Sequence, residues 1–186
     1  YNSKATAAAI LAAIDWLDSK EGPESTVVFF YSGHGFQVPD SWGWDNDRET
    51  DGYDEGIVSY DLYAITDGYL AARFNTFESQ KFALVFCSCN SGGMFDDNDD
   101  LQAKGRVIVS ACAADQLAWD YLLLGNTLFG YYFVDEGIRD GKAETSVPAD
   151  GVSMEEAFEY AYPRVTALKA DSQPQIYDGF KGELIP

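Results

Sequence analysis

The chain has 186 residues and a formal net charge of −19, from 31 acidic and 12 basic side chains. With 46% hydrophobic residues it can bury a sizeable core, and we expect one domain over residues 1–186. The charge argues against nucleic acid and anionic membrane as partners, because both would be repelled, whereas a basic peptide would be attracted. No apolar run approaches the length of a membrane span.

Alternating helix and strand signals run along the first two thirds of the chain. An alanine-rich apolar stripe predicts a helix over residues 5–19, ended by the turn signal at 22–23. Short apolar runs predict three buried strands, at 26–31, 82–86 and 106–110. A helix at 68–77 would connect the first two strands, so we predict an α/β fold with a mostly parallel sheet covered on both faces.

Two later segments have helical spacing, at 127–139 and 153–168. Thr127 and Ser153 are expected to cap the N-termini of these helices. Glu156 follows Ser153 by three residues, which is the spacing of a capping box.

Two stretches lack periodicity and are predicted to be loops. Residues 35–54 contain Trp42 and Trp44, which either form a wall of a substrate cleft or anchor the loop on the body of the fold. Residues 94–104 contain the run DDNDD and are interpreted as a solvated acidic turn.

Reactive side chains follow two of the predicted strands. The first strand ends in SGHG, which holds His34, the single histidine of the chain. The second ends in CSCNSGG, which holds Cys87 and Cys89. Because ligands of an open α/β sheet bind beyond the carboxyl ends of its strands, these residues predict a cysteine nucleophile with a histidine base.

The motifs YSGHG at 31–35 and CSCNSGG at 87–93 resemble the paired active-site motifs of caspase-like cysteine peptidases, above all metacaspases. The segments 53–61, 65–70 and 105–120 resemble, in the same order, the loop between the two catalytic strands and the strand after the nucleophile. The resemblance covers roughly residues 5–140, and residues 141–186 are expected to supply a helical and sheet-edge part. It implies a caspase-like three-layer sandwich.

The resemblance also implies the roles of the site residues. Cys89 would be the nucleophile and His34 the base, and the backbone amides of Gly35 and Cys89 would stabilise the oxyanion. The substrate would be a peptide or protein, cleaved through a thioester acyl-enzyme, and the chemistry itself would require no cofactor. Cys112, between two alanines, is interpreted as a small buried residue.

The chain departs from the metacaspase pattern at three places. Cys87 stands where these enzymes have a pocket aspartate that binds a substrate arginine or lysine, so one charge partner of a basic P1 residue is lost. We still expect P1 arginine or lysine from the negative field. Asn90 replaces the usual histidine after the nucleophile. The strand, helix and strand that open the family's domain do not precede the first helix, so we expect an N-terminal segment or fragment to complete the sheet.

Many metacaspases require calcium, which binds to a small cluster of aspartates near the active site. The resemblance places three positions of this cluster at Asp54, Asp67 and Asp96, and a fourth is occupied by Gly68. Calcium takes about 6 to 8 oxygen ligands, and carbonyls or waters can replace one carboxylate. The alternative is that these are three unrelated surface acids.

Two other functions remain open from the sequence. A legumain-like or clostripain-like peptidase would share the histidine and cysteine at strand ends. A catalytically inactive caspase-like domain would serve as a calcium-binding or interaction module, a reading that the presence of both His34 and Cys89 disfavours.

Overall fold

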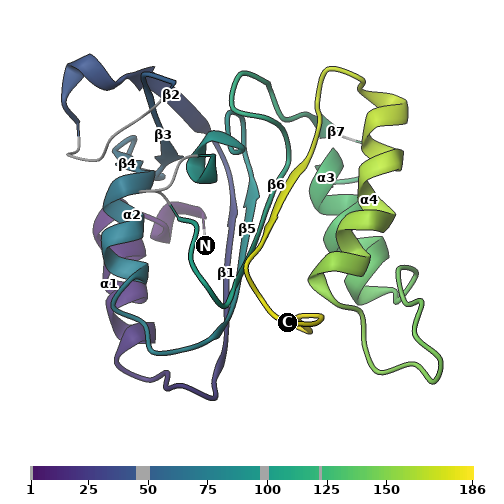
Figure 1. Ribbon diagram of the computed structural model, residues 1–186. Coiled ribbons are helices and arrows are strands. Elements are labelled where there is room, and N and C mark those ends of the chain that lie inside the picture. The colour runs from purple at the N-terminus through teal and green to yellow at the C-terminus, as the bar shows by residue number, and fades with distance from the viewer. Residues whose placement is uncertain (1, 45–50, 97–100, 122) are drawn as a thin grey trace.

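The computed structural model describes residues 2–44, 51–96, 101–121 and 123–186, and its centre is a four-stranded sheet between two groups of helices (Figure 1). The strands are β1 (Thr26–Ser32), β5 (Lys81–Cys87), β6 (Arg106–Ser110) and β9 (Gln175–Asp178), in the spatial order β1-β5-β6-β9. The first three are parallel and β9 is antiparallel to β6. The predicted α/β class with a mostly parallel sheet is confirmed.

One face of this sheet packs against α1 (Ala7–Asp18) and α2 (Asp67–Phe74). Because side chains alternate along a strand, Phe82, Leu84 and Phe86 of β5 all point to this face and are buried. Phe74 of α2 meets Phe82 edge to face, with ring centroids 5.1 Å apart. The helices predicted at 5–19 and 68–77 are therefore the layer that covers this face.

The other face packs against α3 (Leu128–Gly130), η4 (Tyr131–Arg139) and α4 (Met154–Leu168). The Thr127 side chain caps α3 by accepting a hydrogen bond from the amide of Gly130. Ser153 forms the predicted capping box with Glu156 at the start of α4. The predicted helix at 127–139 is present, but η4 has the wider π-helical form. A two-stranded ribbon of β7 (Asp120–Tyr121) and β8 (Asn126–Thr127) leads into this layer.

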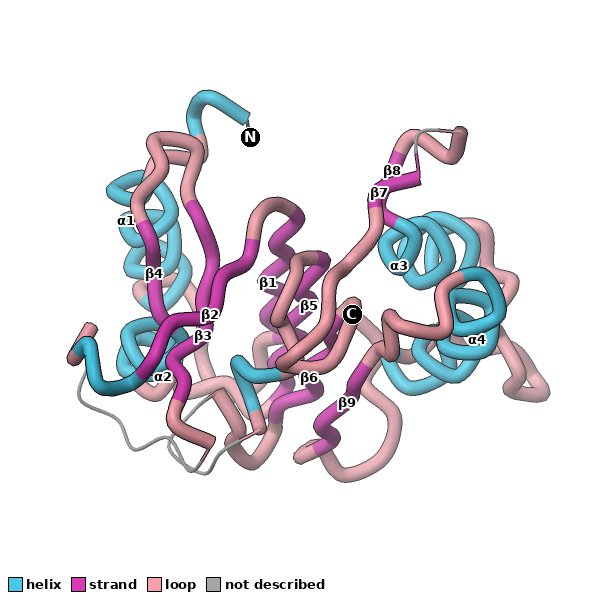
Figure 2. Tube along the Cα trace, turned by 90° about the horizontal axis from the view of Figure 1, so that it is seen from above, coloured by secondary structure: helices cyan, strands magenta, loops and turns pink. Residues whose placement is uncertain are grey.

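A second sheet, outside the central one, contradicts the predicted loop at 35–54. Strand β2 (Gly35–Pro39) pairs antiparallel with β3 (Tyr53–Val58), which pairs with β4 (Ala64–Thr66) (Figure 2). The short helix η2 (Asp40–Trp42) follows β2. The segment at 53–61 was expected to be a loop, yet it begins with β3. The strands were missed because β2 is short and its partner is distant in sequence.

The segment after the nucleophile also differs from its prediction. Residues 94–104 were expected to be a solvated turn, but η3 (Gly93–Phe95) begins this stretch and Met94, Phe95 and Leu101 are buried. Residues 97–100 of the acidic run lie outside the described residues, as do residues 45–50 of the first predicted loop. The apolar side chains on either side of the acidic run hold the segment to the core.

Strand β1 lies at an edge of the central sheet, and within the described residues its one partner is β5. Val28 and Phe30 stand opposite Ala83 and Val85, so they point toward the face covered by α3 and α4. They remain 46% and 48% exposed. This edge is therefore apolar and open.

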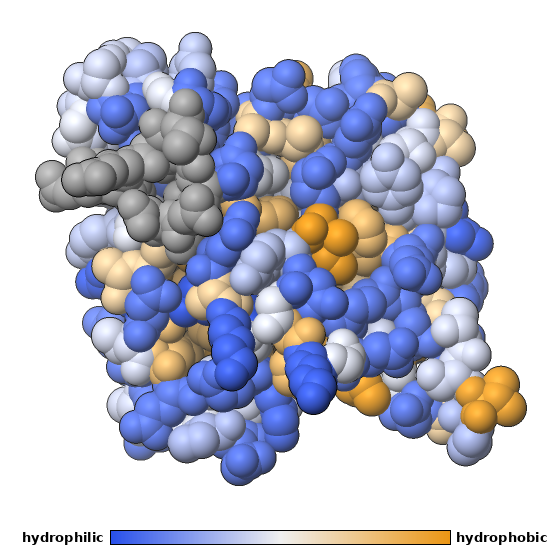
Figure 3. Space-filling model, in the orientation of Figure 1, coloured by the Kyte–Doolittle hydropathy of each residue, from blue (hydrophilic) through white to orange (hydrophobic). Residues whose placement is uncertain are grey.

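The rest of the surface is mostly polar, in agreement with the net charge. Hydrophilic side chains cover most of the face in Figure 3, with separate apolar patches between them. Within the described part of the chain, no helix combines the length and apolar character needed to cross a membrane. The short helix η1 (Asn2–Lys4) precedes α1.

Candidate functional site

The two catalytic candidates follow neighbouring parallel strands. Ser32 at the end of β1 is paired with Cys87 at the end of β5, and the amide of Gly33 donates to the carbonyl of Cys87 at 3.4 Å. An ideal Cβ placed on Gly35 would lie 2.0 Å from the carbonyl oxygen of Cys89. The backbone after His34 therefore touches the backbone of Cys89, and glycine is required at this approach.

His34 is exposed, and hydrogen bonds hold its backbone in place. Its carbonyl accepts from the amide of Val58 at 2.9 Å and from the hydroxyl of Tyr31 at 2.8 Å. The imidazole thus projects from the junction of β1 and β2, with β3 as a support. The supporting role of Tyr31 was missed from the sequence, although the residue belongs to the YSGHG motif.

The cysteine loop is held by the segment that follows β6. Cys89 is half-buried, and its thiol faces the carbonyl of Ala118 at 3.8 Å. Asn90 adopts a φ of 56°, a left-handed conformation that asparagine tolerates well, and its side chain donates to the carbonyl of Ala114 at 2.6 Å. Its amide donates to the carbonyl of Gln116 at 2.9 Å.

Gln116 extends this support toward the C-terminal part of the chain. Its side-chain oxygen accepts from the amides of Ala113 and Gln173, at 3.4 and 2.7 Å. Gln116 was not predicted from the sequence. No local pattern marks it, because its partners are distant in sequence.

The other two cysteines are buried. Cys87 is 1% exposed and packs in the cluster beneath α3 and α4, where burial raises its thiol pKa to about 12. Cys112 is fully buried, as expected, and burial raises its thiol pKa to about 11. Since the thiolate is the nucleophilic form, both are poor nucleophiles at neutral pH.

A cavity of about 360 Å³ opens next to the end of β1. Ser32, Thr127 and the β7–β8 ribbon line it, and Asp120 supplies a carboxylate. The Cys87 thiol reaches this region through a hydrogen bond with the Thr127 side chain. Cys87 was expected to line the substrate pocket; its side chain is buried, and Cys87 is not among the described residues that line this cavity.

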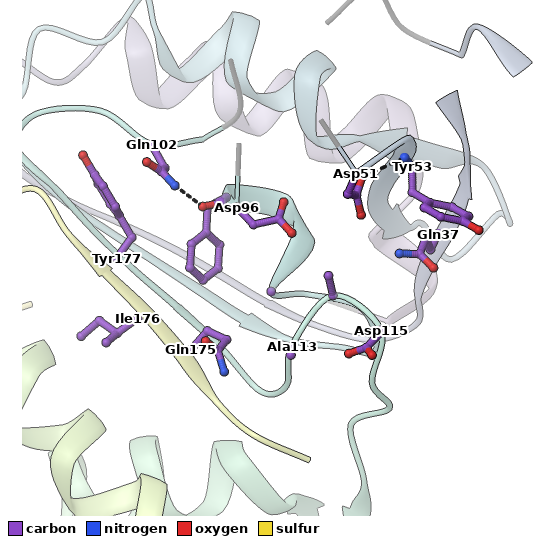
Figure 4. A pocket seen from close by; sticks show the side chains of 13 residues that line it. Gln37, Asp51, Tyr53, Asp96, Gln102, Ala113, Asp115, Gln175, Ile176 and Tyr177 are labelled. Carbon is purple, nitrogen blue, oxygen red and sulfur yellow. Dashed lines mark hydrogen bonds between the residues drawn. The ribbon is translucent and has the colours of Figure 1, made fainter. Parts of the chain in front are cut away.

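A second and larger cavity has a volume of about 660 Å³ (Figure 4). The β2–β3 hairpin, η3, the segment after β6 and β9 contribute to its wall. Among the described residues that line it, three are acidic: Asp51, Asp96 and Asp115. Gly92 of the cysteine loop lines it as well, so the cavity adjoins this loop.

The three acids expected to bind calcium differ in environment. Asp54 and Asp67 are fully buried, whereas Asp96 is exposed. Asp67 accepts from the amide of Glu55 at 3.3 Å, and Glu55, which was not predicted as a site residue, is also fully buried. Carboxylates suit a hard cation. The described residues nevertheless contain no group of three or more histidine, cysteine or acidic side chains arranged to hold a metal ion.

Trp42 and Trp44 are 61% and 48% exposed. Their ring centroids lie 5.9 Å apart, and that of Trp44 lies 5.6 Å from the ring of Phe36. The two indoles therefore pack against each other, and Trp44 packs against Phe36 of β2, while both remain at the surface.

Comparisons with known proteins agree with this arrangement. A crystal structure of a protein from Geobacter sulfurreducens superposes with a TM-score of 0.67 over 97% of this chain and 76% of that one, at 19% identity, which supports the caspase-like fold alone. Metacaspase-1A of Aspergillus terreus is 36% identical over 99 residues, 50% of this chain and 24% of the relative. Metacaspase-1 of Candida albicans is 37% identical over 95 residues, 47% of this chain and 21% of the relative.

The chain thus spans about a quarter of the length of these curated relatives. The family model described as "Metacaspase, peptidase C14 domain" matches residues 1–98, a region that includes both His34 and Cys89. The match extends over more than half of the sequence, and the chain belongs to the metacaspase family.

Proposed function

We propose that this chain is a cysteine endopeptidase in which Cys89 is the nucleophile and His34 the general base. The observation that carries the proposal is the contact between the two motifs, in which Gly35 packs directly against the carbonyl of Cys89. It brings the residue after the histidine to the backbone of the nucleophile. Family membership supports the same reaction class.

The reaction would proceed in two halves. The Cys89 thiol gives its proton to the His34 imidazole while its sulfur bonds to the substrate carbonyl carbon, and the amides of Gly35 and Cys89 donate to the resulting oxyanion. The C–N bond then breaks, and the amine leaves with the proton from the imidazolium. Water, deprotonated by His34, hydrolyses the thioester and releases the acid and the free thiol.

The test compares four proteins: the parent, Cys89→Ala, His34→Ala and the double variant. Because a nucleophile and its base act as a unit, each single variant should lose nearly all peptidase activity and the double variant should be little worse. Cys87→Ala should retain measurable turnover. Full activity in Cys89→Ala would refute the assignment of the sulfur.

The same comparison separates the alternatives. A parent protein without activity, and without reaction between Cys89 and peptidyl electrophiles, would favour an inactive interaction module. Profiling against a positional-scanning peptide library would distinguish a legumain-like preference from a basic one.

We further propose that the P1 residue is arginine or lysine and enters the cavity beside the end of β1. Asp120 supplies an acidic group there, although position 87 lacks one. Asp120→Asn should lower kcat/KM for a basic P1 residue more than for a neutral one, and Cys87→Asp should raise the preference for basic P1. Unchanged selectivity in both variants would contradict this pocket.

Calcium activation through Asp54, Asp67 and Asp96 remains a separate proposal. The buried carboxylates of Asp54 and Asp67 have the oxygen donors that calcium takes, with affinity expected between roughly 10⁻⁴ and 10⁻³ M. Calorimetry and peptidase assays across calcium concentrations test it. No binding heat, and activity indifferent to chelator and to Asp96→Ala, would eliminate calcium and leave the dyad intact.

We also propose a partner for the edge strand β1. The exposed apolar side chains of Val28 and Phe30 at the sheet edge favour an N-terminal segment or fragment that adds a strand and covers them.

A further inference from the structure

The hydroxyl of Tyr31 lies at the junction of three strands. It contacts the carbonyl oxygens of His34 and Val58 at 2.8 and 2.7 Å, and the amide of Val58 approaches its oxygen at 3.3 Å. The same amide donates to the carbonyl of His34 at 2.9 Å. One phenol at the end of β1 thus connects the histidine turn to the end of β3.

The turn is built around this phenol. An ideal Cβ on Gly33 would lie 2.5 Å from the Tyr31 oxygen, so glycine lets the phenol fold back under the residues that follow it. Burial raises the pKa of Tyr31 to about 12, and the hydroxyl therefore keeps its proton throughout the neutral range. The hydroxyl is therefore available as a hydrogen-bond donor at neutral pH.

The histidine needs such a support more than the cysteine does. Cys89 lies in a loop fixed by Asn90 and by the carbonyl of Gln116, whereas His34 is exposed and projects from an edge strand. A general base must stay within hydrogen-bond reach of the proton it removes. A displacement of the His34 backbone would move the imidazole relative to Cys89.

We infer that Tyr31 is a positioning residue, whose hydroxyl clamps the His34 backbone to β3 and thereby fixes the imidazole relative to Cys89. This inference rests on the proposed function, in which His34 is the base. Tyr31 does not touch the substrate in this account. Its hydroxyl acts through the His34 carbonyl, so its loss should reduce turnover and leave substrate binding almost unchanged.

The experiment compares the parent with Tyr31→Phe, which removes one oxygen, and with Tyr60→Phe as the matched control at a 62% exposed tyrosine. Steady-state kinetics should show kcat lowered about 10-fold to 100-fold in Tyr31→Phe, with KM within about twofold, because misplacement of a catalytic group acts on the chemical step. Tyr60→Phe should match the parent.

NMR supplies a readout independent of activity. His34 is the single histidine, so one set of imidazole signals reports its ring. Relaxation of that ring and of the Gly35 amide should show greater mobility in Tyr31→Phe than in the parent and in Tyr60→Phe. If Tyr31→Phe does not fold, the parent alone is decisive: its Gly35 amide should be as ordered as the amides of β1, and a mobile Gly35 amide would overturn the clamp.

An unchanged kcat in Tyr31→Phe, or a ring as ordered as in the parent, overturns the inference. A fall in stability without either change would show that the hydroxyl supports the fold alone, which also overturns it. If the parent has no peptidase activity, the proposed function fails, and ring relaxation alone then decides whether Tyr31 orders His34.

Discussion

Strands β1 and β5 have similar apolar sequences and carry the two catalytic candidates, yet their environments differ. Six of the seven residues of β5 are buried, and the strand has a partner on each side. In β1, exposed residues alternate with more buried ones, and the strand lies at an edge. Cys89 therefore follows a buried central strand of the sheet, and His34 follows an edge strand.

This difference explains how the two arms of the site, the histidine turn at 33–35 and the cysteine loop at 88–93, are each stabilised. The cysteine loop continues from a buried strand and is then tied to the segment after β6 by Asn90. The histidine turn depends on β3 and on the Tyr31 hydroxyl. An apolar run thus predicts a strand, but the neighbours of the strand determine how much its residues contribute to stability.

The largest effect is expected from truncating one phenylalanine on each strand. Phe86→Ala removes a fully buried ring from β5 and should cost about 3 to 5 kcal/mol of unfolding free energy. Phe30→Ala removes a half-exposed ring from β1 and should cost less than about 1 kcal/mol. Chemical denaturation measures both, and equal losses would refute the contrast between centre and edge.

The next effect concerns the contact between the two arms. Gly35→Ala would place its Cβ 2.0 Å from the carbonyl oxygen of Cys89, so the arms must separate. We expect peptidase activity to fall on the order of 100-fold, because small displacements of reacting groups are costly. Gly22→Ala is the matched control, since its Cβ meets nothing within 4 Å. Equal activity in both variants would show that the arms are not held by this contact.

A smaller effect is expected within the cysteine loop. Asn90→Ala places a Cβ-bearing residue without a polar side chain at a φ of 56° and removes the hydrogen bond to Ala114. The combined cost should be about 1 to 2 kcal/mol. Asn90→Gly keeps the backbone conformation accessible and should cost less. Thermal unfolding of the two variants compares them, and a larger loss for Asn90→Gly would contradict this account of the turn.

The smallest effect on stability is expected at the open edge. Changing both Val28 and Phe30 to lysine should alter unfolding free energy by about 0.5 kcal/mol or less, because both side chains are half-exposed. It should nevertheless reduce self-association, since lysine on an edge strand opposes pairing. Sedimentation velocity measures this, and a parent protein that is already a monodisperse, cooperatively folding monomer would contradict the proposal of an added strand.

The sequence predicted what local patterns encode. The strands at 26–31, 82–86 and 106–110 and the capping box at Ser153 follow from short apolar runs and from fixed spacing. The placement of His34 and Cys89 at neighbouring strand ends was predictable for the same reason, once the sheet was recognised as parallel.

Long-range pairing was not predictable in this way. The β2–β3 hairpin joins segments separated by residues with no periodic pattern, and it buries Asp54 and Glu55, whose sequence suggests an exposed loop. Gln116 gains its role from contact with Gln173 and the cysteine loop. Such residues are defined by tertiary contacts, which no local pattern encodes.

The central claim is that Cys89 is a nucleophile activated by His34, and site-mapped labelling tests it most directly. The folded protein would be treated at neutral pH with a peptidyl electrophile that has arginine at P1, and the adduct located by peptide mass spectrometry. Because burial raises the thiol pKa of Cys87 and Cys112, we predict one adduct, at Cys89, formed much more slowly in His34→Ala. Labelling at Cys87, or an equal rate in His34→Ala, would contradict the account.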